Sequence, residues 1–272
     1  MFDLPQDIND AAKGSLNGTN GGVPLPFPAP EMWWKNGEAA LGSLKEITDA
    51  RRFGGWGISK EGLDNLPGPI QPVPADSVLF ELTNSESKIY EAFLTRQAWV
   101  APIARRYAWF EYNGKSASRV NYLCFLGMFK KGEPIQPWGA VVLSAKSYAG
   151  IDLDNAFKTF ATKTASLRKS TAHNFFYIPL GTWGPEVKYA TRSSKKGDTS
   201  SVTPVQLYEP KDGWTAETLQ TMFVGADVAK QMMELKNEAS AWLDDWNKRN
   251  NKSESVDPNA ALEAAEQSTP FD

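Results

Sequence analysis

The segment 99–112, rich in aromatic residues and containing one proline, constrains the fold of this chain most strongly. Pro102 lacks an N–H and clashes with a preceding helical turn, so the segment does not suit a regular helix. Its aromatic content favours a β-strand, in which alternate side chains share a face. A strand would place three cationic or aromatic side chains on one face: Arg105, Tyr107 and Trp109.

Such a face suits single-stranded nucleic acid, because bases stack on aromatic rings while cations hold the phosphates. The alternative is an ordinary strand with one face in the core and its arginines at a solvated end. If the face binds nucleic acid, Arg105, Tyr107 and Trp109 should be accessible, whereas Ala108 and Phe110 should be buried.

Charge is distributed unevenly along the chain. Residues 88–196 hold 17 Lys and Arg against 6 Asp and Glu, a net charge of +11, and 19 of the 32 aromatic residues. The segments 1–87 and 197–272 carry net charges of −6 and −8, so the overall charge of −3 conceals a basic centre. A basic, aromatic centre between acidic ends indicates a nucleic-acid partner.

Several chemistries are not expected. The single cysteine, Cys124, lies in an apolar run and is expected to be buried, and the single histidine, His173, is expected in a loop. Neither supports a zinc or multi-histidine metal site, and no glycine-rich phosphate loop is present, so we expect no metal and no cofactor. No apolar run reaches about 18 residues and no basic leader is present, which predicts a cytoplasmic protein without membrane contact.

Composition divides the chain into five segments. They are a disordered Pro- and Gly-rich arm over 1–30, an extension with a short helix (43–52) over 31–76, a β-body over 77–210, helices over 211–249 and a disordered acidic tail over 250–272.

The β-body has strand patterns on both sides of one helix. Strands are predicted over 78–82, 89–97, 119–127, 139–146, 174–180, 187–191 and 203–208, with polar loops over 114–118 and 192–201. The helix is predicted over 152–169, with Asp152 and Asp154 in its first turn. The class is therefore mainly β with helices (α+β), and an OB-fold-like barrel is the expected architecture, with another α+β sheet as the alternative.

Two C-terminal helices are predicted over 215–223 and 227–249. The second has an apolar stripe formed by Val228, Met232, Leu235, Ala239, Trp242 and Trp246. The stripe needs an apolar partner, either the body of the same chain or a second copy in an oligomer.

The basic centre supplies the candidate nucleic-acid-binding residues. They are Arg105, Arg106, Tyr107, Trp109, Lys115, Arg119, Lys130, Lys131, Trp138, Trp183, Lys188, Arg192, Lys195 and Lys196. Phosphate attraction and stacking do not read sequence, so binding would be non-specific and sensitive to salt. Each aromatic residue has core packing as its alternative.

A basic aromatic β-body followed by an acidic tail with a terminal aromatic resembles the single-stranded DNA-binding proteins of bacteria and their phages. The tail ends in Pro270, Phe271 and Asp272, similar to the bacterial Pro-Phe ending that docks replication partners, although here an aspartate follows and the preceding acids are sparse. The segments 99–112 and 202–207 also look like uncharacterised proteins of bacterial plasmids and phages.

The resemblance implies a non-enzymatic single-stranded DNA-binding protein of replication or recombination, with a tail that recruits partners. One alternative is a Mg²⁺-dependent nuclease that uses Glu186 and Lys188 with Asp152 and Asp154, since such enzymes combine carboxylates with a lysine beside the attacking water. The other is a structural or adaptor protein that assembles through the helix at 227–249.

Overall fold

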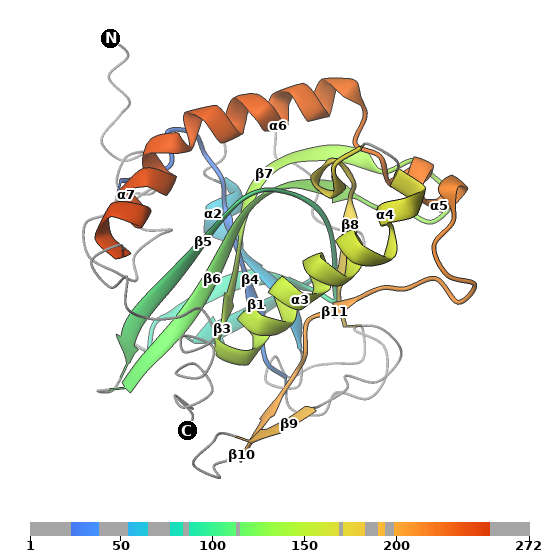
Figure 1. Cartoon of the computed structure of the whole chain (residues 1–272). Helices are drawn as coiled ribbons and strands as arrows, with labels where there is room; N and C mark the ends of the chain where they lie inside the picture. Colours follow the sequence, from blue (N-terminus) through green and yellow to red (C-terminus); the bar gives the residue numbers. More distant parts are fainter. Residues whose placement is uncertain are drawn as a thin grey trace.

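The protein is built around one nine-stranded sheet that curls into a half-barrel (Figure 1). This computed structural model describes residues 23–37, 54–64, 77–83, 87–112, 115–168, 171–182, 190–193 and 199–250. Across the sheet the strands are β11 (Gln206–Leu207), β8 (Ile178–Gly181), β5 (Gln97–Tyr112), β6 (Lys115–Met128), β7 (Gln136–Lys146), β1 (Glu31–Lys35), β2 (Gly55–Ser59), β4 (Ile89–Thr95) and β3 (Val78–Thr83). The predicted class, mainly β with helices, is confirmed.

The sheet is mixed rather than wholly antiparallel. Strand β1 runs parallel to β7, and the other neighbouring pairs of the described sheet are antiparallel. The curl brings β2 close to β8, so that the Trp56 indole N–H donates to the Leu180 carbonyl at 3.2 Å. Trp56 is fully buried there, in agreement with a packing role for this residue.

Strands β5 and β6 form a long hairpin at the centre of the protein. The strand predicted around Pro102 is confirmed, and the register shifts between Pro102 and Ala104, as expected where proline interrupts a ladder. The loop predicted over 114–118 is wrong. Strand β6 already begins at Lys115, which pairs with Tyr112, because β5 supplies a ladder partner along this polar stretch.

The inner face of the half-barrel encloses the main core. Helix α3 (Ser147–Lys163) packs there through Leu153, Phe157 and Phe160, which join buried residues of β1, β2, β5, β6, β7 and β8. Cys124 is among them and is fully buried, as predicted.

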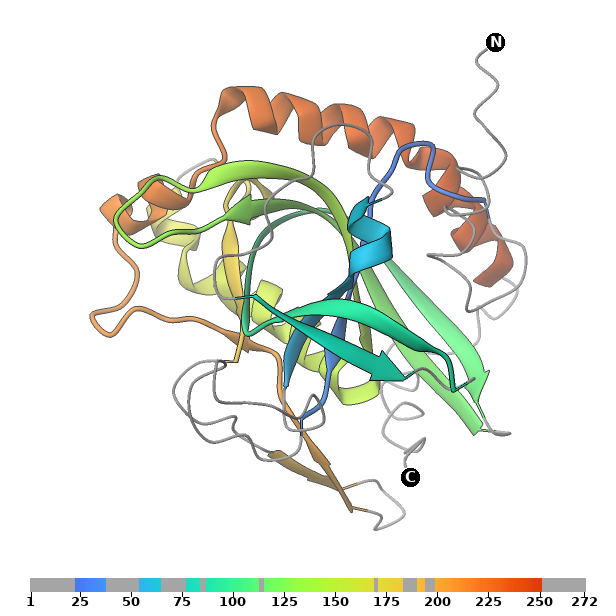
Figure 2. The same ribbon diagram turned by 180° about the vertical axis from the view of Figure 1, so that it is seen from behind.

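The outer face is covered by helices α6 (Ala226–Glu238) and α7 (Ser240–Asn250) (Figure 2). Val228, Met232, Ala239 and Trp242 of the predicted apolar stripe are buried against β5, β6 and β7, so the body of the same chain is the partner of these residues. The proline-rich segment 23–30 adds Leu25 and other apolar side chains to this second cluster.

The remaining elements are short. They are α2 (Lys60–Asp64), α4 (Ala165–Arg168), η3 (His173–Phe175), α5 (Ala216–Met222) and a separate hairpin of β9 (Ala190–Ser193) and β10 (Thr199–Val202).

Two further boundaries, of a loop and of a helix, differ from the prediction. Much of the basic loop predicted over 192–201 is therefore strand, because its serines and threonines pair across the hairpin. Helix α3 begins at Ser147, directly after β7, so Asp152 and Asp154 do not lie in its first turn.

Candidate nucleic-acid interface

The far half of the β5–β6 hairpin extends beyond the helices that cover the sheet (Figures 1 and 2). Cross-strand pairs assign its residues to faces. Arg105 lies opposite Tyr122 and Tyr107 opposite Val120, both inner-face positions, whereas Arg106 lies opposite Asn121 on the outer face. The alternation predicted for Arg105, Arg106 and Tyr107 is thus confirmed.

The two inner-face candidates differ in accessibility. Arg105 is exposed, as predicted, whereas Tyr107 is half-buried against the main core. Their side chains are neighbours, with the Arg105 guanidinium carbon 5.6 Å from the Tyr107 ring centroid. The side chains of Ala108, Trp109 and Phe110 lie outside the described residues, so the rest of this prediction stands untested.

Arg105 belongs to a polar network with helix α3. Its Nε donates to Asp154 Oδ1 at 3.0 Å while its second nitrogen contacts Oδ2, and the Tyr122 hydroxyl donates to Oδ1 at 2.6 Å. Burial, followed by the nearby Asp154 carboxylate, raises the pKa of Tyr122, which stays a protonated donor. The carboxylate offsets the Arg105 charge, so this arginine holds the hairpin on α3 more than it offers a free cation.

Three cations form what we term the basic row, on the outer face across the turn-proximal halves of β5 and β6 and the end of β7: Arg106, Arg119 and Lys146. Arg119 of β6 lies directly opposite Lys146 of β7, and Arg106 of β5 is the diagonal neighbour of Arg119. Directly opposite residues have Cβ atoms about 5 Å apart, and diagonal ones about 7–8 Å. Lys35 of β1, two residues beyond the Trp33–Ser144 pair, continues the row.

Charges in the basic row affect one another. The Lys146 side chain is exposed overall, but protein around its ammonium group partly desolvates it, and this desolvation lowers its pKa. Arg119 lowers that pKa further, and Glu31 opposes the shift. The ammonium group of Lys146 is thus influenced by its burial, by a neighbouring cation and by a carboxylate.

Arg106 is held by an aromatic ring of the last helix. Its guanidinium carbon lies 4.0 Å from the centroid of the Trp242 ring, a cation–π contact on a residue that is fully buried. Stacking of this kind fixes the plane of the guanidinium relative to α7.

Lys130, Lys131 and Trp138 lie at the opposite end of β6 and β7. Arg119 lies near the start of β6, and Lys130 follows its end, eleven positions further on, a chain length of at most about 36 Å. Between the two ends, α6 covers the outer face and α3 the inner face. The structure therefore brings together only part of the predicted set, in the basic row.

Other candidates lie partly or wholly outside the described residues. These are Trp183, Lys188, Lys195, Lys196, Pro270, Phe271 and Asp272, the side chains of Trp109, Lys115 and Arg192, and the helix predicted over 43–52. Sequence reasoning missed Lys146 and Lys35. Lys146 is the last residue of β7 and Lys35 the last residue of β1, but only the pairing of these strands places the two lysines beside Arg119.

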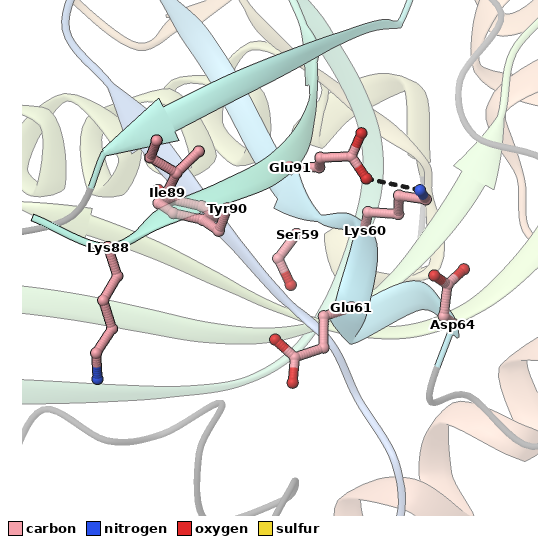
Figure 3. A pocket seen from close by; sticks show the side chains of 8 residues that line it. All are labelled: Ser59, Lys60, Glu61, Asp64, Lys88, Ile89, Tyr90 and Glu91. Carbon is pink, nitrogen blue, oxygen red and sulfur yellow. Dashed lines mark hydrogen bonds and ion pairs between the residues drawn. The ribbon is translucent and has the colours of Figure 1, made fainter.

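A second surface feature is an open pocket of about 640 Å³ beside β2, α2 and β4 (Figure 3). Lys60 and Glu91 form an ion pair across it at 2.6 Å. Its lining combines two lysines with three carboxylates, from Glu61, Asp64 and Glu91. This balance of charge does not suit a polyanion.

Metal-ligating clusters and membrane-spanning helices are absent from the described parts of the chain. No group of three or more metal-ligating side chains occurs there, and Asp154 is engaged by Arg105 and Tyr122. Of the helices that the structure describes, none combines the length and the apolar character needed to cross a membrane. Comparison of the chain with protein-family models, curated proteins and solved structures gives no match.

Proposed function

We propose that this protein binds single-stranded DNA without sequence specificity through the basic row on the outer face of β5, β6 and β7. It would act in replication or recombination, with the tail ending in Pro270, Phe271 and Asp272 as a contact for partner proteins. An OB-like barrel stays a prediction, and the proposal depends only on the exposed end of the curled sheet.

The observation that carries the proposal is the direct opposition of Arg119 and Lys146. Like charges directly opposite one another on a sheet are unfavourable for folding. A phosphate group near the pair would be attracted by both cations, and its binding would release counterions. Arg106, oriented by Trp242, adds a planar donor beside the pair.

A single strand suits the site better than a duplex because the same hairpin is rich in aromatic residues. The sequence of β5 supplies several aromatic residues to this hairpin, although Tyr107 itself lies on the inner face, on the side of the sheet opposite to the basic row. Unpaired bases can stack on such rings, whereas the bases of a duplex are already stacked on one another.

Titration with fluorescent dT oligomers at several salt concentrations tests the proposal. For single strands, the logarithm of affinity falls with the logarithm of salt concentration by about 0.7 per phosphate contact. The triple variant Arg106→Gln, Arg119→Gln and Lys146→Gln should therefore bind more weakly, with a slope reduced by about 2.

A charge-matched triple variant controls for the loss of net charge. Lys158→Gln, Lys211→Gln and Lys236→Gln replace exposed lysines that lie outside β5, β6 and β7 and do not belong to the basic row. It should retain most of the affinity and slope of the parent. Absence of dT binding by the parent at low salt, or equal losses in the two triple variants, contradicts the proposal.

The other two functions have no described feature in their favour. Glu186 and Lys188 lie outside the described residues, so the nuclease is tested only by cleavage assays of Glu186→Ala in Mg²⁺. The adaptor hypothesis required the apolar stripe of the helix predicted over 227–249 to pack on a second copy. Val228, Met232 and Trp242 of that stripe instead pack on the sheet of the same chain.

A further inference from the structure

An aromatic stack lies at the other end of β6, away from the basic row. The rings of Trp99 and Phe129 are parallel to within 14° and their centroids are 4.2 Å apart. Trp99 is half-buried, whereas 39% of Phe129 is exposed. One ring of the pair is thus anchored, and the other is accessible to solvent.

The residues beneath the stack restrict its movement. Trp99 pairs with Gly127, and a Cβ on that glycine would come within 2.8 Å of the buried Tyr177 ring and 2.5 Å of Ile135. The chain after Phe129 turns sharply, with the Glu133 N–H donating to the Lys130 carbonyl at 3.0 Å. The exposed ring is therefore presented from a closely packed base.

Positive charge adjoins the exposed ring. Lys130 is paired with Glu133 in the turn, whereas Lys131 is exposed and has no ion-pair partner among the residues that the structure describes. An accessible aromatic ring beside a lysine provides a stacking surface for a base and a cation for its phosphate.

We propose that Phe129, supported by Trp99 and assisted by Lys131, is a second contact for the same DNA strand, where one unpaired base stacks. This inference rests on the proposed function, since it assigns a second contact to a strand that binds the basic row. Arg119 and Phe129 are ten positions apart, along β6 and one residue beyond its end, a chain length of at most about 33 Å, so the shortest oligonucleotides are not expected to reach both contacts.

The experiment measures affinities of the full chain for dT30 and dT4 by fluorescence anisotropy. Phe129→Leu should weaken dT30 binding by about 5- to 150-fold, the range that corresponds to loss of one stacked base. Phe129→Trp should retain dT30 affinity, and neither variant should change binding of dT4. Tyr208→Leu, which removes an equally exposed aromatic ring near β11, is the matched control and should bind dT30 like the parent.

The outcomes separate this inference from the proposed function. If the parent does not bind dT30, the proposed function fails. If the parent binds dT30 and Phe129→Leu binds it equally well, or loses dT4 affinity to the same extent, the second contact is overturned while the function stands.

A measurement on the parent chain avoids any folding defect of the variants. Photocrosslinking to dT30 that contains 5-iodo-deoxyuridine, followed by peptide mapping, should yield a crosslink at Phe129. A crosslink map that covers this peptide and lacks the adduct overturns the proposal.

Discussion

The guanidinium of Arg106 stacks on the ring of Trp242, with its central carbon 4.0 Å from the ring centroid. This contact joins the β5–β6 hairpin to α7. The last described helix therefore takes part both in the outer core and in the orientation of a cation of the basic row.

Replacement of the ring should affect stability and DNA affinity together. Trp242→Phe should lower the free energy of unfolding by roughly 1–3 kcal/mol, since it removes part of a fully buried side chain. A double-mutant cycle with Arg106→Gln, measured by urea unfolding, should give a coupling of about 0.5–2 kcal/mol. Additive effects of the two substitutions would contradict an energetically significant cation–π contact.

The Asp154 carboxylate should be important for attachment of the hairpin to α3. Asp154→Ala leaves Arg105 and the Tyr122 hydroxyl without their acceptor, and should cost about 1–3 kcal/mol in urea unfolding. Tyr122→Phe removes one donor only and should cost less. Glu234→Gln, in a loose exposed pair with Lys230 at 4.0 Å, serves as the control and should be nearly neutral.

Lys146 should show opposite effects on stability and binding. Its folded pKa is lowered from 10.5, so the unfolded chain binds the proton more readily, and the contribution of this residue to stability rises with pH up to about 10.5. Lys146→Gln should therefore be neutral or stabilising by less than about 1 kcal/mol at pH 7, because the residue is exposed.

Lys146→Gln should also remove part of the increase in the free energy of unfolding at alkaline pH, and it should weaken dT binding. Urea unfolding at pH 7 and at pH 10, for parent and variant, measures the pH effect. Clear destabilisation of Lys146→Gln at pH 7 would show that the lysine makes a net favourable contact in the folded protein.

The fold was predictable where the apolar pattern has a clear period. The strand at 119–127 reads as one continuous apolar run, and the stripe from Val228 to Trp242 has helical spacing. The beginning of α3 was not predictable from the sequence, because β7 passes into the helix without a loop and Ser147, with φ 47°, makes the turn. A helix start after a strand without intervening loop residues has no signal of its own in the sequence.

The single thiol provides a direct probe of unfolding. Burial raises the pKa of Cys124 well above its ordinary value, and the side chain is inaccessible in the main core. Ellman's reagent should therefore leave the native protein unmodified and titrate one thiol in urea. Rapid stoichiometric reaction without urea would contradict the position of Cys124 in the core.

The site was less predictable than the fold, because it depends on which strands are neighbours. Strand alternation separated Arg105 from Arg106 correctly. It could not place Lys146 opposite Arg119, since that proximity comes from the β6–β7 register alone. It also could not show that helices on both faces divide the basic residues between two ends of the hairpin.

The central position of β1 has a consequence for synthesis of the protein. Glu31 pairs with Val142, so this early strand waits for β7 to leave the ribosome before its parallel ladder can form. Such distant pairing slows folding, and β1, which can pair with β2 but whose other edge stays open, is a site for aggregation in the meantime. Nascent chains that stop before β7 should therefore need chaperone protection, whereas chains that extend past Lys146 can close the middle of the sheet.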